Sequence, residues 1–385
     1  MTDDERRMSR PPRWLLMAGH VPADCRGGGI VRYTVELARA LARRDDVELH
    51  LLTTAAAAGP LADLAGGAGR VVPLPAVPEG AHPAVERYLL GRTLGDRFDV
   101  VQGTKHLLPR GVAARTALTV HDMILFDRPE DFPLTKRTLL GRPYAGSLRQ
   151  AEVLLCVSAA TRARLAQWSP GVADRAAVVP LATSPRLLQS APEPVTELAG
   201  RPFALVVGDT IPRKNLGVVV TAWARVAQQR PDALLALVGP QPWGKQSYGP
   251  HHADLVAAGS VVHLVGVGDG TLRWLYEQAA VVLAPSLLEG FGLPAVEALD
   301  LGAPLVTSRD PALVEVSGDA APHLPFDEPD AWAAAVLERL AAPPDRRALA
   351  RQPRSWDDVA AETVAAVLGG PAEEPRGPAA GTPAG

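Results

Sequence analysis

Cysteine is scarce in this sequence of 385 residues, and the scarcity excludes several kinds of site. Cys25 and Cys156 are the two cysteines, and they are widely separated. Two such cysteines cannot form a disulfide framework or a cysteine metal cluster, so a reducing cytoplasm is the expected location. Long apolar runs are missing too, and none approaches the ~20 residues needed to span a bilayer. The charged opening, MTDDERRMSR, precedes no apolar segment longer than one strand, so we expect no signal peptide.

A strong charge of either sign is also missing. The formal net charge is −3, which gives no reason to expect nucleic acid as a partner. The chain is 47% apolar and 21% charged, as in soluble globular proteins, and its length suits two domains of near-equal size. No G-x-G-x-x-G followed by an acidic residue opens either half, which argues against a nicotinamide dehydrogenase.

The most informative stretch of the sequence is residues 281–308, VVLAPSLLEGFGLPAVEALDLGAPLVTS. The apolar runs at its two ends are typical of strands buried on both faces. Between them, Pro294 is expected to be the first residue of a helix, and Gly302 to end that helix in a left-handed conformation. The stretch therefore predicts a strand, loop, helix and strand, with the helix beginning just after the EGFG loop.

This loop has the features of an anion site flanked by carboxylates. Gly290 and Gly292 leave backbone N–H groups uncovered at the helix N-terminus, where the helix dipole favours negative charge. Glu289 in the loop and Glu297 in the predicted first turn can accept hydrogen bonds from the hydroxyls of a sugar or a ribose. A simpler alternative stays open on these residues alone: Glu297 complements the helix dipole, and Glu289 is a solvated loop residue.

The whole string resembles the retaining, nucleotide-sugar-dependent glycosyltransferases of family four, which have the two-domain GT-B fold. Their hallmark is a Glu, seven intervening residues and a second Glu within EGFGLPxxEAxxxGxPVxxS. Here it reads EGFGLPAVEALDLGAPLVTS, with Asp300 and Leu301 where the family often has Ala and Cys. The resemblance implies an α/β fold of two Rossmann-like, doubly wound domains that face each other across a cleft. It places the acceptor mainly on the first domain and the donor mainly on the second.

Two further motifs of the family lie in the first half of the chain. Residues 27–41 resemble GGIxRYxxxLAxAL, whose glycine amides, here Gly28 and Gly29, lie near the donor phosphates and the acceptor. HDMILFDRPEDF resembles HDxxxxxxPExF, and the resemblance puts His121 beside the sugar carbon that is attacked. Without the resemblance, a structural histidine that hydrogen-bonds the next loop is the favoured interpretation of His121.

The second half carries a pair of cations before a predicted helix. Arg213 and Lys214 oppose the helix dipole at this position unless an anion neutralises them. In the family this PRKN segment holds the donor diphosphate, and prearranged cations stabilise the charge of the leaving group without a metal. The sequence has no DxD triplet, the usual metal-binding signature of the other main glycosyltransferase fold. Asp209 stands where many relatives have a further Arg, which leaves the identity of the donor open.

The resemblance also suggests how the chain divides. We expect an acceptor-side domain at 12–182, a donor domain at 201–352, a helix at 353–368 that crosses back to the first domain, and a disordered tail at 369–385. Residues 136–150 form a basic helix candidate, and in some relatives a basic helix in this part of the chain touches membrane. A solvated helix face is favoured here, and a peripheral contact with the inner face of the membrane stays open.

The implied activity is transfer of a hexose from a nucleotide diphosphate-sugar, a co-substrate, to an unidentified acceptor hydroxyl, with retention and with neither cofactor nor metal. It would serve bacterial glycoconjugate or specialised-metabolite biosynthesis. Arg213 and Lys214 would stabilise the diphosphate, Glu297 would bind the ribose, and Glu289 with the amides of residues 290–293 would orient the sugar. The implied binding residues are Gly28, Gly29, Gly290, Phe291, Gly292, Leu293 and Glu297, and the implied catalytic residues are His121, Arg213, Lys214 and Glu289.

Three points stay open on the sequence alone. No residue is assigned as a general base. A phosphorylase or epimerase acting on nucleotide sugars could use the same fold. A non-catalytic sugar-binding partner of another enzyme would share many of the same residues.

Overall fold

The computed structural model describes residues 10–239, 248–342, 345–349 and 351–369. Its strands form two sheets in which every paired strand is parallel to its neighbour. The seven-stranded sheet has the order β3 (Val71–Pro73), β2 (Glu48–Thr53), β1 (Arg13–Met17), β4 (Val100–Gly103), β5 (Arg115–Val120), β6 (Val153–Cys156), β7 (Ala176–Val178). The six-stranded sheet has the order β10 (Val261–Val265), β9 (Leu234–Gly239), β8 (Phe203–Val207), β11 (Val281–Ala284), β12 (Leu305–Ser308), β13 (His323–Leu324). The predicted α/β fold with two Rossmann-like sheets is confirmed.

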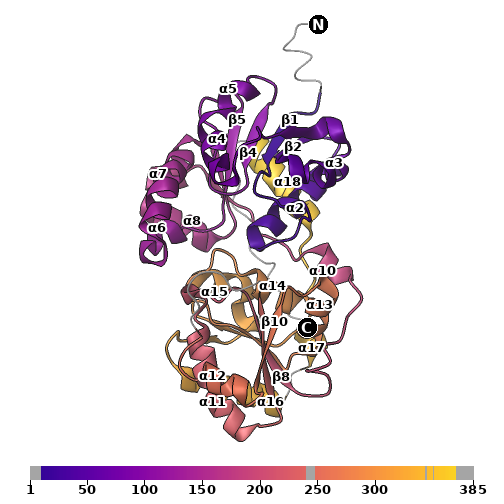
Figure 1. Cartoon of the computed structure of the whole chain (residues 1–385), viewed down its shortest axis with the longest axis vertical. Coiled ribbons are helices and arrows are strands. Elements are labelled where there is room, and N and C mark those ends of the chain that lie inside the picture. The colour runs from indigo at the N-terminus through magenta and orange to yellow at the C-terminus, as the bar shows by residue number, and fades with distance from the viewer. Residues whose placement is uncertain (1–9, 240–247, 343–344, 350, 370–385) are drawn as a thin grey trace, which may run out of the picture.

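Helices join these strands and cover the sheets (Figure 1). Those of the first half are α2 (Gly29–Ala42), α3 (Ala58–Ala65), α4 (His82–Tyr88), α5 (Leu90–Leu94), α6 (Ile124–Asp127), α7 (Leu134–Gln150), α8 (Ala159–Trp168), α9 (Pro170–Ala173) and α10 (Pro185–Gln189). Those of the second half are α11 (Leu216–Gln229), α12 (His252–Ala257), α13 (Asp269–Gln278), α14 (Leu293–Asp300), α15 (Pro311–Ser317), α16 (Pro329–Ala341), α17 (Arg346–Leu349) and α18 (Trp356–Leu368). In the described parts of the chain, no helix combines the length and the apolar character that crossing a membrane requires.

In each sheet the chain adds strands outward on one side of its first strand and then returns to add the others on the opposite side. In the first sheet this switch point lies between β1 and β4, where Trp14 pairs with Val100. In the second sheet it lies between β8 and β11, where Ala204 pairs with Val281. Open α/β sheets bind ligands beyond the carboxyl ends of their strands at such points. The fold therefore offers two ligand positions, one on each sheet.

The last helix, α18, packs against the first sheet although it ends the described chain. Ser355 caps it, because the hydroxyl accepts a hydrogen bond from the backbone N–H of Asp358 while the Asp358 carboxylate accepts from the N–H of Ser355. Trp356 is 2% exposed and lies in the same core as Tyr33 of α2. In Figure 1 the yellow α18 lies among the indigo elements of the first half. The last helix thus returns from the second sheet to the first.

Residues 59–83 contain regular elements, although their richness in Gly, Ala and Pro is typical of a variable connection. They contain most of α3, the short edge strand β3 and the start of α4. A three-residue edge strand in a segment rich in Ala, Gly and Pro leaves no periodic signal to detect. The predicted tail, from residue 370 onward, lies outside the described residues, as do residues 240–247 between β9 and α12.

Candidate functional site

The loop between β11 and α14 has the shape that its glycines and proline predict. The helix begins at Leu293, one residue before Pro294, and Gly302 beyond its end has a φ of 65°. Gly292 caps the helix with a φ of 96°, in the left-handed region that favours glycine. A Cβ atom at Gly292 would also lie 2.6 Å from the side chain of Leu313. Position 292 therefore requires glycine, and the predicted helix with its left-handed ending is confirmed.

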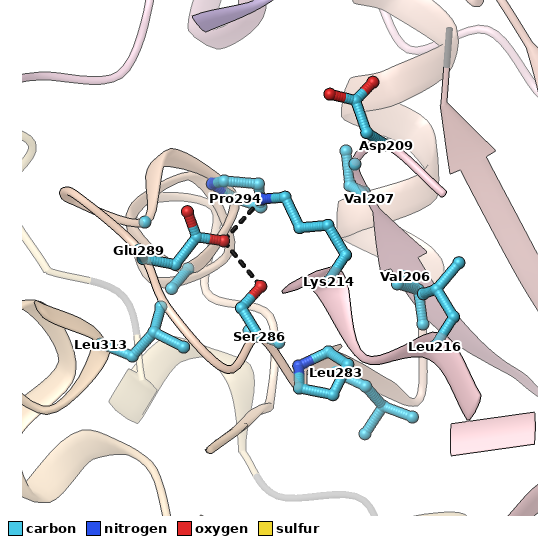
Figure 2. A pocket seen from close by; sticks show the side chains of 15 residues that line it. Val206, Val207, Asp209, Lys214, Leu216, Leu283, Ser286, Glu289, Pro294 and Leu313 are labelled. Atoms are coloured by element: carbon cyan, nitrogen blue, oxygen red, sulfur yellow. Dashed lines mark hydrogen bonds and ion pairs between the residues drawn. The ribbon is translucent and has the colours of Figure 1, made fainter. Parts of the chain in front are cut away.

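Glu289 lies in this loop and contacts both predicted cations. Its Oε1 accepts hydrogen bonds from Lys214 Nζ at 2.5 Å and from Ser286 Oγ at 2.6 Å (Figure 2). Arg213 Nη1 lies 3.4 Å from Oε2 of the same carboxylate. Burial raises the pKa of Glu289, but Lys214 and Arg213 outweigh it and lower the pKa to about 2. Glu289 is thus a paired carboxylate that is ionised at neutral pH, and the alternative of a solvated loop residue is wrong.

The backbone of the PRKN segment fixes the position of these cations. Pro212–Lys214 form a single 3₁₀ turn directly before α11. Asn215 then takes a left-handed φ of 54°, and its amide donates a hydrogen bond to the Pro285 carbonyl at 3.2 Å. The Leu287 N–H donates to the Arg213 carbonyl at 2.8 Å. The cation turn and the Glu289 loop are therefore tied together by the backbone as well as by charge.

Lys214 and Glu289 line a pocket at the switch point of the second sheet (Figure 2). Asp209 lines the same pocket, at the position where many relatives have a cation. Gly208 of this wall has a φ of 148°, and a Cβ atom there would lie 3.6 Å from Lys214 Cε. A diphosphate bound here would meet Lys214 and the amide groups at the start of α14, with Asp209 as a nearby negative charge.

Glu297 does not lie where the sequence predicted. It is the fifth residue of α14, beyond the first turn, and it is 1% exposed. Oε2 accepts a hydrogen bond from Tyr276 Oη at 2.8 Å, and Oε1 pairs with Arg32 Nη1 of α2. Burial raises the pKa of Glu297, and Arg32 opposes that rise without cancelling it. Glu297 thus links the two sheets, and the proposal that it merely complements the helix dipole is wrong.

We expect Arg32→Met to lower the free energy of unfolding by roughly 1–3 kcal/mol, because it leaves a buried carboxylate without its cation. The loss should be larger at pH 8 than at pH 5. A folded-state pKa above the unfolded value means that stability falls as pH rises through the folded pKa, and removing Arg32 raises that pKa further. Urea unfolding at the two pH values measures the effect. The double variant Arg32→Met/Glu297→Gln should recover most of the stability, and an equal loss at both pH values would contradict the assignment.

Gly290 and His121 bring the two halves of the site into direct contact. A Cβ atom at Gly290 would lie 1.7 Å from the His121 carbonyl oxygen, so the two backbones touch. The Gly290 carbonyl accepts hydrogen bonds from Ser158 Oγ at 2.5 Å and from Thr161 Oγ1 at 2.9 Å, both at the start of α8. The EGFG loop is therefore held against the carboxyl edge of the first sheet.

The His121 ring has partners within the first sheet. Its Nε2 lies 2.9 Å from the Thr104 carbonyl oxygen, and its ring stands edge-on to Tyr33 with centroids 4.7 Å apart. Burial lowers the pKa of His121. The structural hydrogen bond to a neighbouring loop is therefore present. A neutral imidazole at this place is compatible with the predicted position beside the reacting carbon, which stays a prediction.

The remaining residues that the sequence predicted to bind a ligand are Gly28, Gly29, Phe291 and Leu293. Gly28 caps α2 in extended conformation and is exposed, and a Cβ atom there would have no neighbour within 4 Å. A Cβ at Gly29 would lie 3.6 Å from Leu293 Cδ1, so the N-termini of α2 and α14 meet. Phe291, in contrast, is 7% exposed and belongs to the core of the first sheet. Its side chain anchors the loop, so its backbone is the part that can face a ligand.

Sequence reasoning missed residues that join the two sheets. Arg32 lies three residues after Gly29 in the quoted glycine motif, yet nothing local indicates a partner on α14. The Glu315 carboxylate accepts hydrogen bonds from the N–H groups of Ala159 and Ala160, at 2.8 Å each. Asp300, noted as a departure from the family, accepts from Thr183 Oγ1 at 2.5 Å. Each pair joins residues more than a hundred positions apart, which a periodic pattern does not reveal.

Two family models together match most of the chain. One described as glycosyl transferases group 1 matches residues 191–356, and one described as glycosyltransferase family 4 matches residues 27–187. The chain is 30% identical over 278 residues to O-antigen chain mannosyltransferase B of Escherichia coli, covering 69% of this chain and 73% of that protein. It is 32% identical over 306 residues to the MMP alpha-(1->4)-mannosyltransferase of Mycolicibacterium hassiacum, covering 72% of each.

Solved structures show the same fold at lower identity. Anabaena HepE in complex with UDP superposes with a TM-score of 0.64 at 16% identity, over 92% of this chain and 95% of that one. Sucrose-phosphate synthase of Thermosynechococcus elongatus superposes with a TM-score of 0.62 at 19% identity, over 93% and 95%. These two likenesses extend over both sheets and support the two-domain architecture.

Proposed function

Because the chain belongs to the group 1 glycosyltransferases of family 4, we propose that it transfers mannose from a nucleoside diphosphate-mannose to a hydroxyl of a saccharide, with retention and without a metal. The chain is a glycosyltransferase that uses a nucleotide sugar, and its similar bacterial relatives act in glycoconjugate synthesis. The choice of mannose rests on the names of the two relatives described above, which are both mannosyltransferases. Bacterial glycoconjugate synthesis is the proposed setting.

The observation that carries the proposal is the grouping of Lys214, Arg213 and Glu289 beside the start of α14. In the transfer, the bond between the sugar carbon and the diphosphate oxygen breaks, and its electron pair stays on the diphosphate. The acceptor oxygen forms the new bond to the same carbon, and the proton of the acceptor hydroxyl passes to the departing diphosphate. Fixed cations and helix amides beside the departing oxygen stabilise the charge that develops there. We propose that Lys214 and Arg213 provide this stabilisation in place of a metal ion.

Glu289 and Glu297 have separate proposed roles. Glu289 is ionised, and its remaining lone pairs can accept hydrogen bonds from sugar hydroxyls. Glu297 uses two of its roughly four lone-pair sites for Arg32 and Tyr276. We propose that the remaining sites bind the ribose hydroxyls, so that nucleotide binding and the contact between the two sheets share one carboxylate.

The stereochemical and metal claims are tested together by incubating the protein with GDP-α-mannose and a panel of methyl glycosides, with and without EDTA. Nuclear magnetic resonance of the purified product gives the anomeric configuration. We expect an α-linked product and an unchanged rate with EDTA. A β-linked product would contradict retention, and loss of activity that added Mg²⁺ or Mn²⁺ restores would contradict metal independence.

A further inference from the structure

The switch point of the first sheet carries ionisable side chains that the donor site does not use. Gly19 and His20 follow β1, Lys105 follows β4, and Glu86 reaches the same place from α4. A Cβ atom at Gly19 would lie 2.1 Å from Glu86 Oε1, so the carboxylate rests against the backbone just beyond the end of β1. Since β1 and β4 are the two strands at the switch point, these groups lie where an open α/β sheet binds a ligand.

Glu86 and Lys105 attract each other without touching. Within the described parts of the chain, neither side chain makes a hydrogen bond or a salt bridge, although each acts electrostatically on the other. Glu86 is half-buried and Lys105 is exposed. Burial raises the pKa of Glu86 to about 7 in spite of Lys105, and burial lowers the pKa of Lys105 in spite of Glu86. Glu86 is therefore only partly solvated, and both groups have unused hydrogen-bonding capacity.

The histidines around this pair add no charge at neutral pH. Burial, with a smaller contribution from Lys105, lowers the pKa of His20 and of His106 to about 3. His20 Nε2 lies 3.2 Å from Thr34 Oγ1, which fixes its ring beside α2. Lys136 of α7 is the further cation that acts on Lys105. The place thus has one carboxylate and one ammonium group that act on each other, with neutral imidazoles nearby.

We propose that Glu86 and Lys105 form a hydroxyl-binding subsite for a saccharide acceptor. A hydroxyl placed between them would donate its hydrogen to the Glu86 carboxylate and accept one from the Lys105 ammonium. A phosphate or carboxylate at the same place would satisfy Lys105 but would lie against Glu86, and like charges repel. His121 lies at the same edge of the sheet, since Lys105 acts on it as well, which puts the subsite on the side of the predicted reacting carbon. The inference rests on the proposed function, because only a transferase has an acceptor. Binding of the saccharide, however, can be measured without transfer.

The test is direct binding of methyl α-D-mannopyranoside, measured by calorimetry or saturation-transfer NMR on the full chain, with no donor present. We expect Glu86→Gln and Lys105→Gln each to weaken binding by about tenfold or more, because each removes a charge-assisted hydrogen bond. Asp96→Asn is the matched control, since Asp96 is exposed in the same half of the chain, and it should change affinity less than about twofold. Melting temperatures of all variants show whether each one is folded.

A pH series separates a binding role from a structural one. A hydroxyl donates to the ionised form of Glu86, so wild-type affinity should fall as pH falls through about 7, while Glu86→Gln should show a flat profile. Equal affinity in wild type and both variants would overturn the proposal, as would the absence of glycoside binding to the wild type. Inorganic phosphate binding that Lys105→Gln abolishes and Glu86→Gln strengthens would identify an anion site instead.

Measuring nucleotide binding alongside glycoside binding separates a failure of the subsite from a failure of the proposed function. Glu86→Gln should bind GDP-mannose as the wild type does. Glycoside binding that depends on Glu86, in a protein that binds no nucleotide, would support the subsite and contradict the proposed function. Nucleotide binding with a glycoside affinity that ignores Glu86 would support the proposed function and contradict the subsite.

Discussion

Lys214→Ala is expected to lower kcat by about 10²–10³-fold, the effect typical of removing one preorganised group that stabilises developing charge. The Lys214 ammonium lies 2.5 Å from Glu289 in the pocket at the second switch point, and no second lysine among the described residues lines that pocket. Arg213 remains 3.4 Å from the same carboxylate but also donates to the Leu288 carbonyl at 3.1 Å, so it is less free to move. Steady-state kinetics with a nucleoside diphosphate-sugar measure the effect.

Two companion variants test the reason for this loss. Lys214→Arg keeps the charge and should recover part of the activity. Arg225→Ala removes a partly exposed cation from α11 that pairs with Asp330 of α16, and it should change kcat less than about twofold. A Lys214→Ala enzyme with near wild-type kcat would show that the leaving diphosphate does not depend on this ammonium group.

The same variant predicts a change in the pH dependence of stability. Lys214 is the leading group that opposes burial and depresses the pKa of Glu289 to about 2. A depressed folded pKa gives stability that is present above the ordinary Glu value of 4.5 and is lost as pH falls through the folded pKa. Without Lys214 the pKa of Glu289 should rise, so the gain in stability between pH 3 and pH 7 should shrink.

Gly290→Ala is expected to lower kcat by about a hundredfold and to destabilise the protein by about 1–3 kcal/mol. The new Cβ would lie 1.7 Å from the His121 carbonyl oxygen, a backbone atom that cannot rotate away. The loop must therefore move by more than an ångström relative to the first sheet. That movement would stretch the hydrogen bonds from Ser158 and Thr161 to the Gly290 carbonyl and displace Glu289 beside it.

Gly59→Ala supplies the control for this substitution. Gly59 lies in α3, away from the site, and a Cβ there would meet no atom within 4 Å. Alanine in a helix should be neutral or slightly stabilising at that position. Thermal melting and kinetics of both variants give the comparison. A Gly290→Ala protein with wild-type stability and kcat would show that the two halves of the site need not touch for transfer.

The sequence predicted the parts of this molecule that depend on neighbouring residues. The left-handed Gly302, the helix that starts beside Pro294 and the placement of Arg213 and Lys214 just before α11 all follow from local backbone chemistry. Strands such as β11 were also predictable, because a strand buried on both faces is a short apolar run.

What the sequence did not reveal depends on residues brought together by the fold. Arg32 and Glu297 are 265 positions apart, and their pairing becomes visible only when α2 and α14 meet end to end. Phe291 was expected to bind a ligand through its amide, which stays a prediction, but the sequence did not reveal that its side chain anchors the loop in the core of the first sheet. Glu86 carried no signal because α4 lies in a segment without clear periodicity, and its importance comes from the position of β1 beside it.

The central claim is that the pocket at the second switch point binds a nucleoside diphosphate-sugar through Lys214 and its neighbours. The most direct test is a thermal-shift comparison of wild type and Lys214→Ala with UDP, GDP, ADP and TDP and their common sugar conjugates, in the presence of EDTA. At a hundred times the dissociation constant, binding to the folded state should add about 2.7 kcal/mol of stability. We predict a clear shift of the wild type with one base and one sugar, and a much smaller shift of the variant at the same concentration. No shift of the wild type with any nucleotide, or equal shifts of both proteins, would contradict the account.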